Sequence, residues 1–284
     1  MQRTQLERET AWLLREKHKG KRTPAFLMDE ERLQKGEPLD YLIGFVEFAG
    51  CRIDLSERPF IPRPETEHWT LKAIADLSYN LNICSNYETA RKNHAIRCLD
   101  LFAGSGCVGV AVLKHMPTAH VDFAEKEPRF LKQIRINATL NRINPRRYRI
   151  IESDVFQSKN RTMERSMGLY DYIFANPPYI AKSRRRRVQS SVLKYEPREA
   201  LFAGEDGLKY IRRFLKEAKR HLNPGGRIYL EFDSPQKRAI EKLLSQFGYA
   251  AWQFRKDQFG KWRFAQGGNM RYTARKFLYE TCNS

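Results

Sequence analysis

From residue 96 onward, short apolar runs alternate with longer amphipathic stretches, and this alternation constrains the fold more than any other property of the chain. The apolar runs are IRCLDLF, AHVDFAE, YRIIE, YDYIFA and RIYLEF, and the helical stretches lie near 107–116, 127–141, 206–222 and 235–247. Alternation of this kind predicts an α/β sheet with helices on both faces. Because ligands of such sheets bind at the carboxyl ends of the strands, the candidate site residues are those that follow each apolar run.

The first third of the chain has a different texture. Residues 1–35 predict two short helices, and the two apolar runs of 41–60, which meet at Ala49-Gly50, predict a β-hairpin. IPRPETE then leads into a helix near Thr66, and the polar residues 78–94 predict a linker or loop. These boundaries divide the chain into a helical region, a hairpin with its linker, and the sheet domain, at residues 1–40, 41–65 and 66–284.

Charge and cysteine usage bear on partners and compartment. Lysine and arginine outnumber the acids by 52 to 33, which gives a net charge of +19 and predicts either affinity for RNA, the ribosome or DNA, or a compartment whose proteins are generally basic. The five cysteines show no metal-ligand spacing, so we expect reduced thiols and no bound metal. No apolar run reaches the length of a membrane span, so we expect no membrane association. The first residues are rich in arginine and lysine but also contain Glu7, Glu9 and Glu16, so import into an organelle stays open.

The stretch LDLFAGSGCVG, residues 99–109, predicts a strand, a glycine turn and a helix. Gly104 and Gly106 would let the backbone approach a ligand closely, as only glycine permits. Phe102 stands where the dinucleotide fingerprint has its first glycine, and the lysine of a phosphate-binding loop is absent, so neither NAD nor ATP is favoured.

Acidic residues at successive strand ends describe what this turn would bind. Glu125, about 20 residues beyond the turn, can accept both hydroxyls of a ribose. Asp154 follows the third strand, where its carboxylate can accept an amino hydrogen of adenine, and Asp100 can match a positive charge nearby. Together they predict a pocket for an adenosine-bearing cofactor without phosphates, and S-adenosylmethionine, whose sulfonium is positive, fits that description.

The fourth strand delivers ANPPYI. The side-chain carbonyl of Asn176 and the backbone carbonyl of the Asn-Pro peptide suit the two hydrogens of a planar NH2 group, while Pro177 and Pro178 stiffen the turn. Tyr179 would lie against the flat face of the substrate, so that catalysis comes from proximity, orientation and desolvation. The turn predicts methylation of a nitrogen, but adenine N6, guanine N2 and a glutamine amide all present this shape.

Several segments resemble the HemK/PrmC family of protein-(glutamine-N5) methyltransferases, which act on peptide chain release factors. The similarity extends from about residue 32 to 276 and is carried by GEPLDYLIGFVEF, IPRPETE, NPPYI, YEPREALFAGEDGLKYIRRFL, GGRIYLEF and RKDQFGKWRFAQGG. DNA adenine methyltransferases share only the NPPY turn and the cofactor end. IPRPETE and GEDGL therefore discriminate in favour of a protein amide.

The resemblance implies a class I, Rossmann-like S-adenosylmethionine methyltransferase sheet whose last strand is antiparallel, with a small helical N-terminal domain that docks the release factor. It implies methyl transfer to N5 of the glutamine in the GGQ motif of a class I release factor. The implied cofactor contacts are Phe102, Ala103, Gly104, Ser105, Gly106, Glu125, Asp154, Val155 and Asn176, to which the charge argument adds Asp100, and the implied amide-binding residues are Asn176, Pro177, Pro178 and Tyr179. By position, Arg63, Glu65 and Glu67 would cap the cofactor pocket. The chain departs from the family pattern where Phe102-Ala103 replaces Gly-Thr and Glu125 replaces Asp.

Two basic clusters are not explained by the chemistry of methyl transfer. Arg184–Arg187 follow the NPPY turn, and RINPRRYR occupies 142–149. Each is either a solvated loop or a contact with acidic residues of the release factor, with the ribosome or with RNA. The basic composition and the bacterial type of the family lead us to expect the mitochondrial matrix and a mitochondrial-type release factor, with the cytoplasm as the alternative. Two other functions stay open, a nucleic-acid N-methyltransferase and a non-catalytic RNA-binding protein that keeps the fold.

Overall fold

A computed structural model describes residues 2–87, 95–158 and 167–268 of the protein. Its centre is an eight-stranded sheet of order β6-β5-β4-β3-β7-β8-β10-β9. The strands are β3 (Ile96–Leu101), β4 (Ala119–Glu125), β5 (Tyr148–Asp154), β6 (Gln157–Ser158), β7 (Tyr170–Ala175), β8 (Leu222–Glu231), β9 (Ala251–Lys256) and β10 (Trp262–Gly268). Strands β5, β4, β3, β7 and β8 are parallel, and β10 runs antiparallel to β8. The predicted α/β sheet with an antiparallel last strand is therefore confirmed.

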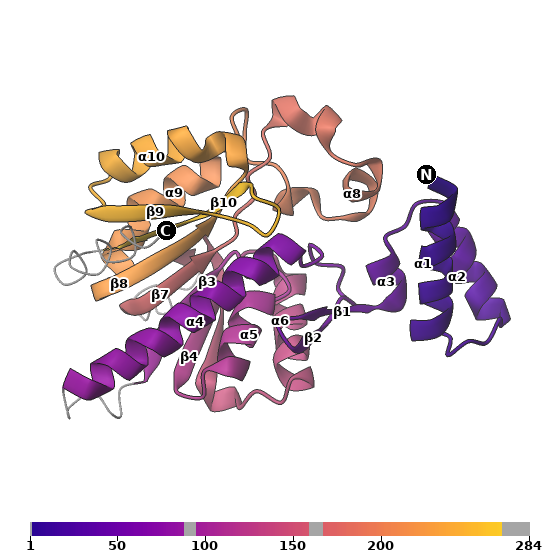
Figure 1. Ribbon diagram of the computed structural model, residues 1–284, viewed down its shortest axis with the longest axis horizontal. Helices are drawn as coiled ribbons and strands as arrows, with labels where there is room; N and C mark the ends of the chain where they lie inside the picture. The colour runs from indigo at the N-terminus through magenta and orange to yellow at the C-terminus, as the bar shows by residue number, and fades with distance from the viewer. Residues whose placement is uncertain (1, 88–94, 159–166, 269–284) are drawn as a thin grey trace.

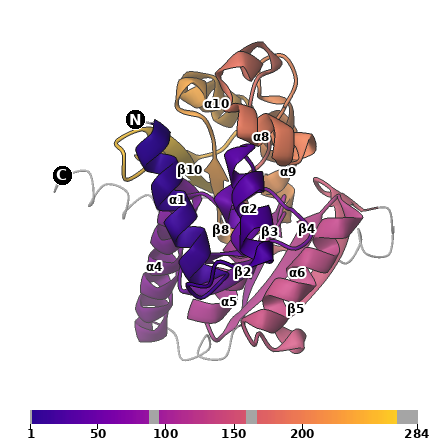
Figure 2. The same cartoon turned by 90° about the vertical axis from the view of Figure 1, so that its right-hand side faces the viewer.

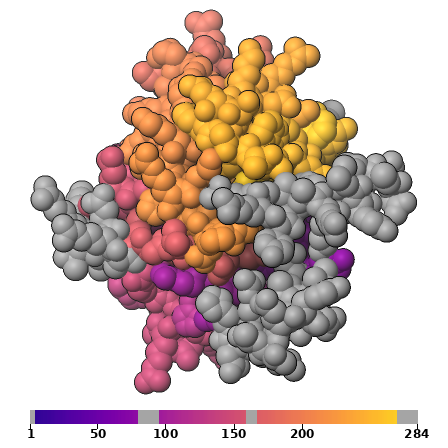
Figure 3. Space-filling view, turned by 90° about the vertical axis from the view of Figure 1, so that its left-hand side faces the viewer, coloured from indigo at the N-terminus to yellow at the C-terminus, as the bar shows by residue number. Residues whose placement is uncertain are grey.

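Helices cover both faces of this sheet, as Figure 1 shows. The helices α4 (Pro64–Tyr87), α5 (Cys107–His115) and α6 (Pro128–Leu140) bury apolar side chains in one core cluster, and α9 (Lys209–Ala218) and α10 (Lys237–Gln246) bury theirs in a second. In α9 the buried residues Ile211, Phe214, Leu215 and Ala218 recur at helical spacing, which gives the helix one apolar face. The side of the molecule shown in Figure 3 is formed largely by the orange and yellow C-terminal segments above magenta ones.

The strand order reverses at β3, because β4 and β5 lie on one side of it and β7 and β8 on the other. In an open parallel sheet such a reversal opens a crevice at the carboxyl ends of the two central strands. The glycine turn follows β3 and the NPPY turn follows β7, so the topology brings these two segments to one crevice although 70 residues of sequence separate Gly106 from Asn176.

A separate helical unit precedes the sheet domain. It comprises α1 (Gln2–Glu16), α2 (Pro24–Gln34) and α3 (Leu39–Ile43), which pack around Leu13, Phe26, Leu33 and Leu42. Figures 1 and 2 show this unit standing beside the sheet domain, joined to it through the hairpin of β1 (Phe45–Phe48) and β2 (Cys51–Asp54). The hairpin turns at Ala49 and Gly50, both with positive φ, as the sequence predicts.

Two sequence expectations need correction. Residues 78–87, expected to be a linker, continue helix α4 to Tyr87. The reason is that this stretch contains neither glycine nor proline to stop the helix, while 88–94 lie outside the described residues. Tyr41–Ile43, expected to belong to the hairpin, form the end of α3, which terminates at Gly44 in the left-handed conformation. Among the described helices, none is both long and apolar enough to cross a membrane.

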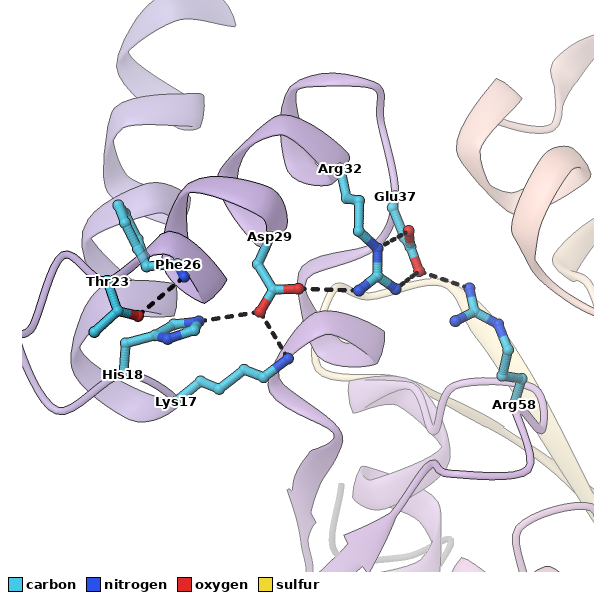
Figure 4. A network of polar contacts seen from close by, with 8 residues as sticks. All are labelled: Lys17, His18, Thr23, Phe26, Asp29, Arg32, Glu37 and Arg58. Carbon is cyan, nitrogen blue, oxygen red and sulfur yellow. Dashed lines mark hydrogen bonds and ion pairs between the residues drawn. The ribbon is translucent and has the colours of Figure 1, made fainter.

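A polar network fixes the helical unit to the linker that follows the hairpin, and Figure 4 shows it. Asp29 on α2 accepts hydrogen bonds or ion pairs from His18, Lys17 and Arg32. Arg32 also forms a two-pronged pair with Glu37, and Arg58 of the linker donates to the same carboxylate at 2.9 Å. Glu37 therefore joins one arginine from the helical unit to one from the linker.

Candidate active site

A cavity of about 220 Å³ lies at the carboxyl ends of the central strands. Its lining contains every predicted cofactor-binding or amide-binding residue except one, namely Asp100, Phe102, Ala103, Gly104, Ser105, Glu125, Asp154, Val155, Asn176, Pro177, Pro178 and Tyr179. The exception, Gly106, lies at the start of α5, where a Cβ would come within 3.1 Å of Ile134. The structure thus brings the predicted cofactor residues and the predicted amide-binding residues into one cavity.

The glycine turn after β3 is held in an unusual backbone conformation. Phe102, Gly104 and Gly106 all have positive φ, of 63°, 53° and 76°. Such angles suit the glycines but strain Phe102, which accepts the conformation while its ring packs edge-on against Tyr210 at a centroid distance of 5.9 Å. Phe102 therefore combines a left-handed backbone with an aromatic side chain in the lining of the cavity.

Glu125 closes the same turn. Its carboxylate accepts hydrogen bonds from the backbone amides of Gly104 at 2.8 Å, Lys126 at 2.7 Å and Glu127 at 2.9 Å. Burial raises the pKa of this carboxyl, and the three amide donors oppose that rise. Because each carboxylate oxygen can accept two hydrogen bonds, Glu125 retains capacity for a ligand hydroxyl in the cavity.

The other two cavity acids have different partners. The carboxylate of Asp154 accepts a hydrogen bond from Arg213 of α9 at 3.0 Å. The sequence pattern does not predict this partner. Asp100 is buried and accepts from the backbone amide of Gly109 at 2.9 Å. Burial raises the pKa of Asp100 to about 8, because the group has lost water, and the nearby negative charge of Glu125 adds to the rise. A positive charge bound in the cavity would favour its ionised form.

Asn176 is oriented by a chain of hydrogen bonds. Its side-chain amide donates to Oγ1 of Thr66 at 3.2 Å, and Thr66 donates its single hydroxyl proton to Glu231 at 2.7 Å. Thr66 can therefore act only as acceptor toward Asn176, which fixes the NH2 end of the amide toward Thr66. The carbonyl oxygen of Asn176 is left for the cavity, as an acceptor for a planar NH2 group requires.

Glu231, at the end of β8, organises the residues behind the NPPY turn. It is 2% exposed and accepts hydrogen bonds from Thr66, from Trp69 at 2.7 Å and from the hydroxyl of Tyr179 at 3.1 Å. Burial raises the pKa of Glu231, and also that of Tyr179, whose hydroxyl faces this acid. Thr66, Trp69 and Glu231 are site residues that the sequence pattern does not predict. The available signal was Glu231 itself, an acid between Leu230 and Phe232 of the apolar run RIYLEF, where an unpaired charge would be costly.

The GEDGL segment supports the NPPY turn from the other side. Ile180 donates to Leu201 at 2.9 Å and accepts from Ala203 at 3.0 Å, so the chain after the turn is bonded to the chain before GEDGL. Gly207 lies so close that a Cβ there would stand 2.3 Å from the carbonyl oxygen of Tyr179. The segment that discriminates the family therefore shapes the turn that holds the acceptor.

IPRPETE contacts the same region. Glu196 of the EPREAL segment is buried, accepts from the backbone amide of Ile61 at 3.2 Å and pairs with Arg63. Arg63 lines the cavity, and Glu65 lines an adjoining groove. The expectation that Glu67 caps the cofactor pocket is wrong, because its carboxylate accepts the backbone amide of Ala49 at 2.6 Å and so fixes the hairpin turn.

The second basic cluster, 142–149, is partly internal. Arg147 donates to the carbonyl oxygens of Leu113, Met116 and Ala119, and Arg149 pairs with Asp122. These two guanidinium groups stabilise the edge of the sheet domain, so their charge has a structural use that the sequence does not reveal.

The geometry can be compared with known proteins. Residues 86–204 match the family model described as methyltransferase small domain. The release factor glutamine methyltransferase of Flavobacterium psychrophilum is 30% identical over 81% of this chain and 74% of the relative. That of Thermodesulfovibrio yellowstonii is 31% identical over 81% of this chain and 76% of the relative.

Among solved structures, the N-terminal domain of human METTL16 in complex with SAH aligns with a TM-score of 0.51 at 14% identity, over 78% of this chain and 76% of that one. At that identity the likeness concerns the fold alone. The sequence relatives reach further, because they are 30% and 31% identical over most of both chains. The chain belongs to the release factor glutamine methyltransferase family.

Proposed function

We propose that the protein transfers a methyl group from S-adenosylmethionine to N5 of the glutamine in the GGQ motif of a class I peptide chain release factor. The observation that carries the proposal is the orientation of Asn176, whose carbonyl oxygen is left for a planar NH2 by the bond from its amide to Thr66. The family membership supports the choice of a glutamine amide over a nucleic-acid base.

The residues of the cavity fit this cofactor. The glycine turn lets the backbone approach it, Glu125 and Asp154 offer carboxylate oxygens, and buried Asp100 gains a partner for its charge. When bound, S-adenosylmethionine supplies a methyl group on a positively charged sulfur. The residues that hold it occupy the ends of β3, β4 and β5, and the amide-binding turn occupies the end of β7.

The chain's own contribution to catalysis is orientation and exclusion of water. Asn176 accepts an N–H of the substrate amide and so aims its nitrogen, while Tyr179, tied by its hydroxyl to Glu231, forms a fixed wall. The amide nitrogen exchanges one hydrogen for the methyl group. The three hydrogen bonds that Glu231 accepts come from residues behind the turn, so this acid orients the site, and the released proton goes to water.

The test supplies the protein with labelled methyl donor and, separately, with a release factor, its GGQ-to-GGA variant, ribosomal RNA and DNA. Label in the factor that vanishes in the variant is the expected result. Label in nucleic acid alone would identify a base methyltransferase, and no label in any substrate would identify a binding protein. Asn176→Ala should abolish transfer while cofactor affinity, measured by calorimetry, stays within about threefold, because a lost acceptor affects the amide most.

The proposed compartment is the mitochondrial matrix, where the substrate is a mitochondrial-type release factor. The support is the net charge of +19 together with the similarity of the chain to a bacterial-type family. Fractionation of cells that express the full chain should recover it in protease-protected mitochondria. Recovery in the cytosol alone would contradict this part of the proposal without affecting the reaction.

A further inference from the structure

A second hollow, the arginine groove, adjoins the catalytic cavity. Its volume is about 360 Å³, and Phe60, Arg63, Tyr179, Ile180 and Leu201 line both hollows. A polypeptide whose glutamine reaches Asn176 therefore has its neighbouring residues at this groove. The inference below rests on the proposed function, because it concerns the substrate of the same site.

The groove receives two of the four consecutive arginines. Residues Lys182–Arg187 form the 3₁₀ helix η3, in which side chains three positions apart lie above one another. Arg184 and Arg187 therefore share a face, and both line the groove, with Arg184 half-buried and Arg187 exposed, whereas Arg185 and Arg186 are exposed and do not line it. Local helix geometry thus divides a run of identical residues into two pairs with different surroundings.

Charge in the groove is mostly compensated. Arg184 pairs with Asp233 at 2.7 Å, and Arg263 pairs with Asp257 at 3.0 Å. Arg63 pairs with Glu196. Within the described part of the chain, Arg187 is the groove arginine that forms no ion pair.

The acids of the groove restrict what this arginine can bind. Glu65, Glu231 and Asp233 share the lining with the arginines. A nucleic-acid strand would bring a phosphate at every nucleotide against these carboxylates, and like charges at short range repel. A single carboxylate on a polypeptide can meet Arg187 without placing further charge on the acids, and the guanidinium fork suits carboxylate geometry.

We infer that Arg187, supported by Arg184 on the same face of η3, binds one acidic side chain of the substrate polypeptide close to the methylated glutamine.

Contacts beside the groove support a defined path by which the substrate polypeptide enters it. Tyr195, at the end of α8 (Ser190–Tyr195), donates to the carbonyl of Lys35 at 3.3 Å, so this segment touches the helical unit. Figure 1 shows α8 on the side of the sheet domain that faces α1–α3.

The experiment measures steady-state methylation of a purified release factor by the full chain and its variants. Arg187→Gln should raise KM for the factor about threefold and Arg187→Glu about tenfold, with kcat within about twofold, as for an ion pair open to solvent. The matched control is the double variant Arg185→Glu with Arg186→Glu. This control changes more charge on the same 3₁₀ helix than Arg187→Glu does. It should nevertheless change KM less, because Arg185 and Arg186 do not line the groove.

A charge exchange identifies the partner. Each acidic residue near the glutamine of the factor is replaced singly by lysine, and one replacement should raise KM for the wild-type enzyme yet lower it for Arg187→Glu. The inference is overturned if no replacement does so, or if the control equals Arg187→Glu. It is also overturned if ribosomal RNA inhibits the wild type competitively and fails to inhibit Arg187→Glu, because the groove would then bind RNA. A wild-type enzyme that leaves the factor unmethylated refutes the proposed function itself, whereas an active wild type with unchanged Arg187 variants refutes only this inference.

Discussion

At the scale of single residues, the orientation of the acceptor depends on a hydroxyl 110 positions away in the sequence. Asn176 donates to Thr66, and Thr66 is committed as a donor to Glu231. An amide without this partner could turn by half a rotation and present NH2 to the substrate, which would replace attraction with repulsion. The catalytic geometry is therefore a property of the trio and not of Asn176 alone.

Thr66→Val tests this view. The valine keeps the shape of threonine but accepts no hydrogen bond, so we expect kcat to fall about fivefold to tenfold, the value of one net hydrogen bond. Cofactor affinity should change less than about twofold, since Asn176 itself remains. Thr66→Ser, which keeps the hydroxyl, should retain most activity. Equal kcat for the valine variant and the wild type would exclude the orienting role.

Asp100 gives a pH prediction. Its folded pKa of about 8 lies above that of an exposed carboxyl, so between about pH 4 and 8 the folded chain holds a proton that the unfolded chain has lost. Its contribution to the free energy of unfolding therefore decreases as pH rises through that window.

Binding of the cationic cofactor favours the ionised form of Asp100, so cofactor binding should release a proton from this group. The affinity for the cofactor should therefore rise between pH 6 and 8, by up to about tenfold per pH unit. Calorimetry in two buffers of different ionisation enthalpy counts the protons. Asp100→Asn should remove the release, and S-adenosylhomocysteine, whose sulfur is neutral, should show less of it. Proton release that persists in the asparagine variant would assign it to another group.

At the scale of elements, the NPPY turn is held between two segments that are remote from it in sequence. The chain at 201–204 bonds to Ile180 and Lys182, and Gln236 donates to the carbonyl oxygens of Tyr179 and Gly207. The turn is stiff for two reasons, its own prolines and this backbone support. GEDGL is thus explained by close packing, because only glycine fits at position 207.

Gly207→Ala should displace the turn. The added Cβ would stand 2.3 Å from the carbonyl oxygen of Tyr179, so we expect kcat to fall more than about tenfold and stability to fall by about 2 kcal/mol or more. Gly225→Ala is the matched control, because its φ of 82° is similarly unfavourable but no atom lies within 4 Å of the added Cβ. It should lose about 1–2 kcal/mol of stability and keep its activity. Urea unfolding and steady-state kinetics measure both, and equal kcat for the two variants would contradict the steric argument.

At the scale of the whole molecule, polar contacts between described residues join the helical unit to the sheet domain and its linker. Glu37 connects Arg32 to Arg58, and Tyr195 reaches Lys35. These contacts set where the helical unit stands relative to the arginine groove (Figures 1 and 4). A substrate that touches both parts would depend on them.

Glu37→Gln should therefore loosen the helical unit. We expect KM for the release factor to rise about threefold. Cofactor affinity should stay unchanged, because the residues that line the cofactor cavity belong to the sheet domain and the linker before it. Glu31→Gln is the control, since Glu31 pairs with Lys35 at an exposed position of α2 and does not reach the linker. The same rise in KM for both variants would show that the effect is one of charge and not of position.

The sequence by itself determined the sheet, its glycine turn and the NPPY turn, because apolar periodicity and turn chemistry are local properties. The sequence also contains the family segments IPRPETE and GEDGL, but their structural roles could not be predicted from the residues alone. Local pattern reading failed at 78–87, where a polar sequence that continues α4 was assigned to a linker, and at Glu67, whose partner is in the hairpin.

Only the tertiary structure decided which residues support the acceptor and which arginines face the groove. Glu231 accepts hydrogen bonds from Thr66 and Trp69, which lie more than 160 residues away in the sequence. No spacing pattern along the chain predicts such a contact. Arg184 and Arg187 are chemically identical to Arg185 and Arg186, and a 3₁₀ helix against a hollow separates them. Hydrogen bonds and ion pairs between distant segments depend on where folding brings their atoms, which is why the structure alone could reveal them.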